Sequence, residues 1–129
     1  MAHASRLSAL CIDCRTDEIG SALEFWRAAF GVEGTIQPNG RFAELATDPS
    51  QPKMFLQSVD HDPRVHLDIE TDDRDAEAKR LENLGAQVLR RNEHLIVTEA
   101  PTGHRFCIVA PKRADFDAHA TRHGGEASQ

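Results

Sequence analysis

The feature that most constrains the fold is an internal repeat. A stretch beginning at Leu10 recurs 55 residues later, beginning at Val65, and the two copies read LCIDCRTDE and VHLDIETDD. Both copies alternate apolar and polar side chains and then lead into an acidic segment, a pattern typical of a strand that precedes a helix. Self-similarity at a fixed period predicts that one supersecondary unit is built twice.

The elements expected on either side of the repeat follow the same order. The first half contains strands at 7–14, 35–37, 41–47 and 53–58 and a helix at 19–30, and the second contains strands at 65–70, 86–90, 95–100 and 105–110 and a helix at 74–84. Each half is therefore a βαβββ module, at about 7–58 and 65–110, inside a single domain that ends near residue 111. The predicted fold is α+β, with the two modules forming a curved mixed sheet around a cleft. A polar tail is expected over 112–129.

The first helix has recognisable signals at both ends. Thr16 or Asp17 is expected to cap its start, and Gly31 is expected to end it. Trp26 and Phe30 lie on its apolar stripe, so they are predicted to be core residues and not ligand contacts.

Composition excludes several classes of function. The chain has 129 residues and a net charge of -6, which argues against binding to nucleic acid or to an anionic membrane surface. It contains no apolar run of membrane-spanning length, and its first residues lack the apolar core of a signal peptide. Three cysteines are an odd number, without disulfide-framework spacing. The expected location is therefore cytoplasmic.

Strand alternation points to a polar site. His66 and Asp68 share one face of their strand, and the repeat places Cys11 and Asp13 opposite them. Two carboxylates beside an imidazole suit acid/base catalysis, so His66, Asp68 and Asp13 are the predicted catalytic residues. The alternative is that the aspartates only bind backbone or arginine groups and hold the two halves together.

Other strand residues complete the predicted ligand-binding set. Phe42 and Phe55 share a strand face with polar residues and are expected to form walls of the cleft, together with Gln57. His119 and His123 lie four apart in the tail and are expected to be a solvated pair, and the segment 124–129 is expected to be flexible.

Several motifs in this order and spacing resemble a known superfamily. They are ALEFWRAAFG at 22–31, VHLDI at 65–69, RLENLGA at 80–86 and APTGHRFCI at 100–108. Over about residues 7–111 the chain is similar to the vicinal oxygen chelate superfamily of glyoxalases, bleomycin-resistance proteins and extradiol dioxygenases, and within it to the small bacterial glyoxalase-like proteins. The resemblance implies a homodimer that binds a small organic molecule in the cleft, as a lyase or isomerase. The alternative is a non-catalytic drug- or metabolite-sequestering protein of the bleomycin-resistance type.

The resemblance also implies four metal-ligand positions, which fall on Cys11, Gln57, His66 and Cys107. His66 is the good match and is the predicted metal ligand, but the two cysteines do not suit hard divalent metals, so the set is incomplete and the cofactor is left unknown. One interpretation is a zinc ion held by Cys11, His66 and Cys107. The cysteines otherwise line the pocket as small apolar residues, or one of them supports a thiol-dependent activity.

Overall fold

The chain forms two compact units, one of which is discontinuous in sequence. The computed structural model describes residues 2–124. Of these, residues 9–66 form a central unit, and residues 2–8 together with 67–124 form a terminal unit. Strands β1 (His3–Arg15) and β5 (Arg64–Thr71) each contribute residues to both units. The chain therefore passes from one unit to the other within these two strands.

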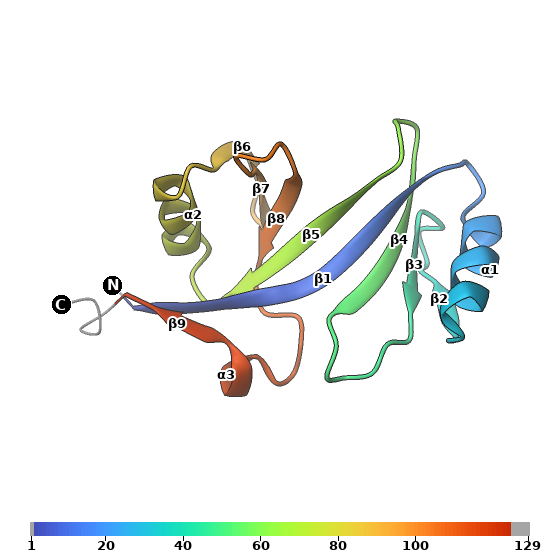
Figure 1. Ribbon diagram of the computed structural model, residues 1–129, viewed down its shortest axis with the longest axis horizontal. Helices are drawn as coiled ribbons and strands as arrows, with labels where there is room; N and C mark the ends of the chain where they lie inside the picture. Colours follow the sequence, from blue (N-terminus) through green and yellow to red (C-terminus); the bar gives the residue numbers. More distant parts are fainter. Residues whose placement is uncertain (1, 125–129) are drawn as a thin grey trace. The chain divides into compact units, whose positions relative to one another are not determined.

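The central unit is a four-stranded sheet covered on one face by a helix. Its elements are residues 9–15 of β1, α1 (Ile19–Phe30), β2 (Gly34–Ile36), β3 (Phe42–Leu45) and β4 (Lys53–Val59). The strand order is β2-β3-β4-β1; β4 runs parallel to β1, and the other pairs are antiparallel. Figure 1 shows α1 beside β2, β3 and β4. The buried core between helix and sheet is made of Ile19, Leu23, Ala43, Leu45 and Leu56.

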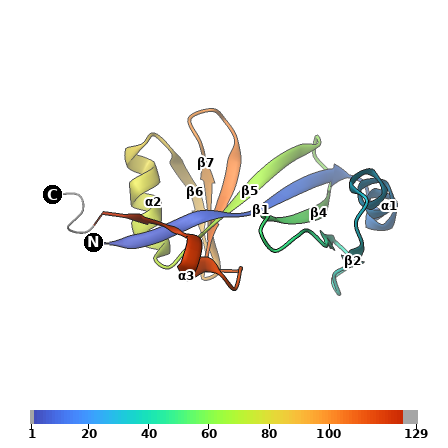
Figure 2. The ribbon, with the colours of Figure 1, turned by 60° about the horizontal axis from the view of Figure 1, so that its bottom comes forward.

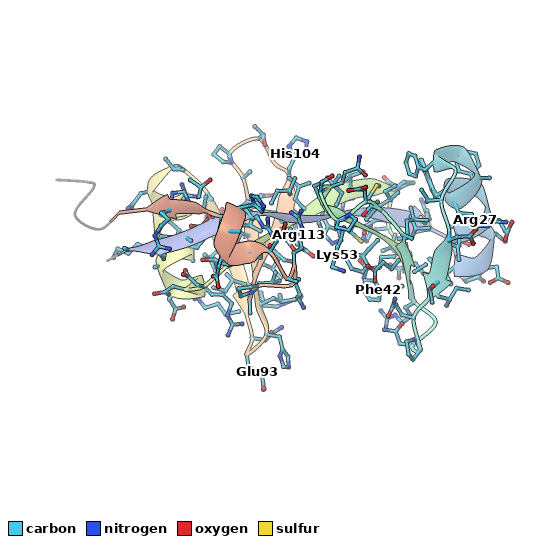
Figure 3. All side chains as sticks on the ribbon, turned by 90° about the horizontal axis from the view of Figure 1, so that it is seen from below. Arg27, Phe42, Lys53, Glu93, His104 and Arg113 are labelled. Carbon is cyan, nitrogen blue, oxygen red and sulfur yellow. The ribbon has the colours of Figure 1, made fainter. Side chains whose placement is uncertain are left out.

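The terminal unit repeats this plan and adds two short elements. It contains residues 67–71 of β5, α2 (Arg74–Asn83), β6 (Gln87–Arg91), β7 (Leu95–Glu99), β8 (Arg105–Val109), α3 (Phe116–His119) and β9 (Thr121–His123). The strand order is β5-β8-β7-β6, with β5 parallel to β8. Figure 2 shows α2 beside β6 and β7, and in Figure 3 Glu93 and His104 mark the turns at the two ends of β7. Its core is Ala78, Ile96, Phe106 and Ile108.

The predicted α+β fold is confirmed. The chain order β1-α1-β2-β3-β4 recurs as β5-α2-β6-β7-β8, and parallel and antiparallel pairs occur in both halves. The helix predicted over 19–30 has those bounds, and it ends as expected at Gly31, whose φ of 70° favours glycine. Its N-cap is Glu18, whose side chain accepts a hydrogen bond from the Gly20 N–H, so the prediction of Thr16 or Asp17 was wrong.

Burial differs from expectation at several apolar positions. Trp26 packs against the central core as a half-buried residue, but Phe30 is 48% exposed, so its assignment to the core was wrong. Phe30 occupies the last turn of α1, where its ring stacks on Trp26 with the centroids 5.5 Å apart, and it is not among the residues packed against the central core. Val65 and Leu67 of β5 are also exposed, whereas Ile69 of the same strand packs against the core that contains Ala78 of α2.

The segment after residue 111 is structured within the terminal unit. A polar tail was expected over 112–129, but this segment contains the four-residue helix α3, followed by β9, which pairs antiparallel with the first residues of β1. The segment 124–129, expected to be flexible, lies outside the described residues apart from Gly124. Between residues 2 and 124 no helix has the length and apolarity needed to cross a bilayer.

Candidate functional site

The face of the central sheet opposite α1 carries five of the predicted site residues. Cys11 of β1 is paired in register with Phe55 of β4, and Asp13 is paired with Gln57. Gln57 is in turn paired with Phe42 of β3. Residues directly opposite each other on neighbouring strands project from the same face of a sheet. The neighbouring residues Ile12 and Cys14 pack on the other face, against the core under α1, as the alternation of the sequence predicted.

Asp13 and His66 form the centre of this site. The Nδ1 atom of His66 lies 3.1 Å from Oδ1 and 3.2 Å from Oδ2 of Asp13. The Asp13 side chain is 3% exposed, and that of His66 is 19% exposed. A buried carboxylate that accepts a hydrogen bond from Nδ1–H fixes the tautomer and orientation of the ring. The Nε2 atom then keeps its lone pair, and it has no hydrogen-bond partner among residues 2–124.

Two further basic groups approach the same carboxylate. Arg64 Nε lies 3.5 Å from Asp13 Oδ2, and His61 Nε2 lies 3.9 Å from that oxygen. His61 lies in the turn between β4 and β5, and Arg64 is the first residue of β5. They were missed because the pairing of β5 residues with β1 is a long-range contact, and local sequence gives no signal for it. Asp13 is thus a single buried anion among three potential cations.

The thiol of Cys11 completes the cluster. Its Sγ atom lies 3.8 Å from Asp13 Oδ1, and one ligand atom from each of Cys11, Asp13 and His66 lies within 4.8 Å of the others. Cys14, on the opposite face of β1, differs in its chemistry. Burial and the nearby Asp13 charge raise the pKa of the Cys14 thiol, which keeps that thiol protonated and unreactive at neutral pH.

A surface depression of about 630 Å³ adjoins the cluster. It is lined by Arg15, Thr16, Asp17, Arg41, Gln57, Ser58, Val59, Asp60 and His61. Two of these residues connect the depression to Asp13. Gln57 is the register partner of Asp13, and His61 is one of the basic residues near the Asp13 carboxylate. The volume lies within the range of small-molecule sites. The lining is polar, with arginine, hydroxyl, amide and carboxylate groups.

Asp68 and Cys107, the remaining predicted site residues, belong to the terminal unit. They are register partners on the parallel strands β5 and β8, and both are half-buried. Cys107 is also paired with Val97 of β7. They therefore form a register pair in the terminal unit that corresponds to Asp13 and Gln57, the register pair of β1 and β4.

Glu70, two residues after Asp68 on β5, has a different environment. It is fully buried and accepts hydrogen bonds from Arg6 Nε, Ser8 Oγ and the backbone N–H groups of Lys112 and Arg113. Burial alone would raise the pKa of the Glu70 carboxyl, but these hydrogen bonds outweigh burial and lower it. Figure 3 shows Arg113 in the segment between β8 and α3. Glu70 therefore anchors the C-terminal segment, and its donors give it a structural role.

Comparison with known proteins agrees with this architecture. A family model described as "Glyoxalase-like domain" matches residues 9–109. The chain belongs to this glyoxalase-like family. No curated protein matches it. The family match covers β1 from Ala9 to the last residue of β8, so it includes every predicted site residue.

Solved structures share the fold at low sequence identity. The Mn(II)-bound glyoxalase of Novosphingobium aromaticivorans is 15% identical with a TM-score of 0.61, over 85% of this chain and 40% of that chain. The 2,2',3-trihydroxybiphenyl 1,2-dioxygenase of Sphingomonas wittichii is 14% identical with a TM-score of 0.61, over 84% and 41%. A hypothetical protein of Bacillus halodurans is 11% identical with a TM-score of 0.57, over 84% and 95%. The glyoxalase-like chain thus spans less than half the length of the first two, and the likeness concerns the fold alone.

The glyoxalase-like chain offers a mixed donor set for the metal that its superfamily implies. Of the four implied positions, Cys11, Gln57 and His66 lie in the central unit, and Cys11 and His66 each have a ligand atom close to Asp13, which is outside the four. Sulfur, carboxylate and imidazole donors together fit zinc and do not fit magnesium or manganese. The residues present therefore fit a thiophilic ion, with Asp13 as the third donor.

Proposed function

We propose that this glyoxalase-like protein binds a small polar organic molecule in the depression beside Asp13 and moves a proton on it through His66. The observation that carries the proposal is the contact of His66 Nδ1 with both oxygens of the buried Asp13 carboxylate. This arrangement leaves Nε2 as the basic atom of the ring and lets Asp13 stabilise the imidazolium that forms.

The surroundings of the pair suit a reaction in which negative charge develops on the bound molecule. Arg64 lies beside Asp13, and its side chain is 47% exposed, so its guanidinium is accessible to a ligand. Removal of a proton from a carbon next to a carbonyl gives an enolate, which a guanidinium stabilises. Return of that proton to a neighbouring atom completes an isomerisation, and loss of a leaving group from the enolate completes an elimination, as in a lyase.

A second candidate rests on the sulfur atom in the cluster. Cys11, Asp13 and His66 would hold a zinc ion, which when bound supplies Lewis-acid polarisation of a ligand oxygen. The two candidates exclude each other at Asp13, because a carboxylate that ligates the metal no longer orients the His66 ring. The positive charge of Arg64 near Asp13 opposes a bound cation and supports the metal-free candidate.

In the sequestering alternative, the protein binds a small molecule but does not catalyse a reaction on it. Apolar drug-binding sites need aromatic walls, and Phe42 and Phe55 are half-buried on the same sheet face. The depression itself is lined by polar groups, which supports a polar ligand. Roles for Asp68 and Cys107 in the site, lyase activity and the homodimer remain predictions.

The test is a thermal-shift screen of small hydroxy acids, keto acids, aromatic acids and thiols, followed by NMR. A ligand that binds the folded protein raises Tm. We expect at least one of these classes to raise the Tm of the wild type and not of His66→Gln, while His94→Gln, which changes an exposed histidine on the turn before β7, behaves as the wild type. The proposal fails if no class shifts Tm or if His66→Gln and Asp13→Asn respond as the wild type does.

Solvent exchange at carbon separates catalysis from sequestration. In D2O, a ligand with an acidic C–H should exchange that hydrogen for deuterium in the presence of the wild type, and its NMR signal should disappear. His66→Gln should abolish this exchange while leaving His94→Gln active. Binding without exchange would contradict the proton-transfer part of the proposal and support sequestration.

A further inference from the structure

Strand β9 is attached to the terminal unit through the start of β1. Within residues 2–124 its three residues pair with no other strand, and the register is His3↔His123, Ala4↔Arg122 and Ser5↔Thr121. Thr121 and Arg122 are exposed, and His123 is the half-buried residue of the strand. The side-chain contribution to this attachment therefore depends on His123.

His123 is hydrogen-bonded to β1 through Ser5. Its Nε2 atom lies 2.8 Å from Ser5 Oγ. A serine hydroxyl can both donate and accept, so either tautomer of the neutral ring can make this bond. The neutral ring carries one proton, and a second proton makes it a cation.

Glu77 is saturated with donors. It is fully buried and accepts two hydrogen bonds from Arg80, at 2.9 and 2.8 Å, and one from His3 Nε2 at 2.7 Å. Burial alone would raise the pKa of Glu77, but the donors, led by Arg80, lower it to about 2. The carboxylate therefore stays ionised under mildly acidic conditions, and its charge is already balanced by Arg80.

A second proton on His123 would place another positive charge in this cluster. The groups facing His123 are His3 and Ser5 of β1 and, beyond them, Glu77 and Arg80 of α2; the His3 ring centroid is 5.3 Å away. His3 is buried, and its Nδ1 has no partner in the described part of the chain, so it offers no compensation. Burial and then the Arg80 charge lower the pKa of His123 in the folded protein.

The start of β1 is held independently of β9. Asp72 accepts a hydrogen bond from Ala4 N–H at 2.8 Å, and the Thr71 hydroxyl donates to the Ala4 carbonyl at 2.7 Å. The α2 network also reaches His3 directly. Loss of β9 would therefore leave β1 attached to β5 and α2, and the opening would be local.

We infer that β9 is an acid-sensitive strand, which detaches from β1 when His123 takes up a second proton while the rest of the terminal unit stays folded. Acid should favour the detached strand. Once detached, His123 is exposed to water and binds the second proton more readily than it does in the docked strand, so a fall in pH shifts the equilibrium toward detachment. The inference does not depend on the proposed function, since every group involved lies in the terminal unit.

The test is hydrogen–deuterium exchange by mass spectrometry on the full chain between about pH 7.5 and pH 5, corrected for intrinsic rates. Below the ordinary histidine pKa of about 6.5, protection of the peptide over 117–124 should fall by up to about tenfold per pH unit. Protection of β7 should stay constant. Simultaneous loss in β7 would mean general unfolding and would overturn the inference, as would protection of 117–124 that does not depend on pH.

Two histidine-to-glutamine variants test whether His123 causes the pH dependence of protection. His123→Gln keeps a side-chain amide that can hydrogen-bond Ser5 but cannot titrate, so it should remove the pH dependence. His119→Gln alters an exposed histidine four residues earlier and should leave the dependence as in the wild type. If β9 of His123→Gln is poorly protected even at neutral pH, the NMR titration of His123 in the wild type is used instead to test whether protonation of His123 causes the detachment. Its midpoint must lie below that of His119 and coincide with the loss of protection, and a midpoint equal to that of His119 overturns the inference.

Discussion

Arg6 of β1 and Glu70 of β5 form a buried ion pair, with Arg6 Nε 2.7 Å from Glu70 Oε2 and side chains 10% and 0% exposed. The same guanidinium donates to Asp115 at 2.5 Å and lies over the buried Phe116 ring. Because Glu70 also accepts from Lys112 and Arg113, these two residues bring the beginning, the middle and the end of the terminal unit's chain together.

Removal of Arg6 should therefore be costly. Arg6→Ala leaves the Glu70 carboxylate buried without its charged partner, a change that typically destabilises a protein by about 3–5 kcal/mol. The free energy of unfolding from urea denaturation measures this effect. Arg15→Ala is the matched control, because the Arg15–Asp62 pair is exposed and should contribute about 1 kcal/mol or less. Equal effects of the two variants would contradict the structural role of Glu70.

The pKa of Glu77 predicts where acid destabilises the protein. A carboxyl whose pKa falls from 4.5 to about 2 on folding stabilises the folded state above pH 4.5, and this contribution is lost as pH falls toward 2. Glu77→Gln should be less stable than the wild type at neutral pH, and the difference should shrink across that window. Unfolding free energies measured at several pH values test this, and a constant difference would contradict it.

The two cysteines of β1 allow a controlled test of zinc binding. If zinc is held by Cys11, Asp13 and His66, then Cys11→Ser should weaken zinc affinity by an order of magnitude or more, and Cys14→Ser should leave it unchanged, since Cys14 lies on the opposite strand face. Competition with a chromophoric chelator gives the affinity. Cobalt should show a thiolate charge-transfer band only while Cys11 is present. Absence of zinc binding by the wild type would favour the metal-free candidate.

A side chain at Gly34 should lower the stability of the central unit. A Cβ atom there would lie 2.5 Å from Leu23 Cδ1 and 3.3 Å from Leu45 Cδ2, both in the central core. Gly34→Ala should destabilise by about 1–3 kcal/mol through overpacking. Gly20→Ala, in the first turn of α1 with only the Glu18 carboxyl nearby, should be neutral or stabilising by up to about 1 kcal/mol. Thermal unfolding compares the two variants.

Local periodicity predicted the parts of the fold that depend on neighbouring residues. The bounds of α1, the alternation of Cys11 and Asp13 against Ile12 and Cys14, and the repeated βαβββ order all follow from signals within one element or its turns. They could be predicted because strand and helix periods fix which residues share a face.

The remaining features depend on contacts between distant residues. His61 and Arg64 lie in a segment that reads as a polar linker, and only the folded chain places them beside Asp13. In the same way, the three residues of β9 have no strand signal of their own, and their conformation depends on pairing with His3, Ala4 and Ser5. A single sequence contains no information on such partners except where a repeat reveals them.

The discontinuity of the terminal unit has a consequence for the order of assembly. All residues of the central unit are adjacent in the chain, so on the ribosome they are available for folding before α2 and its sheet have been synthesised. Helix α2 buries only Glu77 and Ala78, and this glutamate accepts a hydrogen bond from His3, which precedes the central unit in the sequence. His3 must therefore wait until the whole central unit and α2 have been synthesised, so a residue made before the central unit reaches its final contacts only after that unit is able to fold.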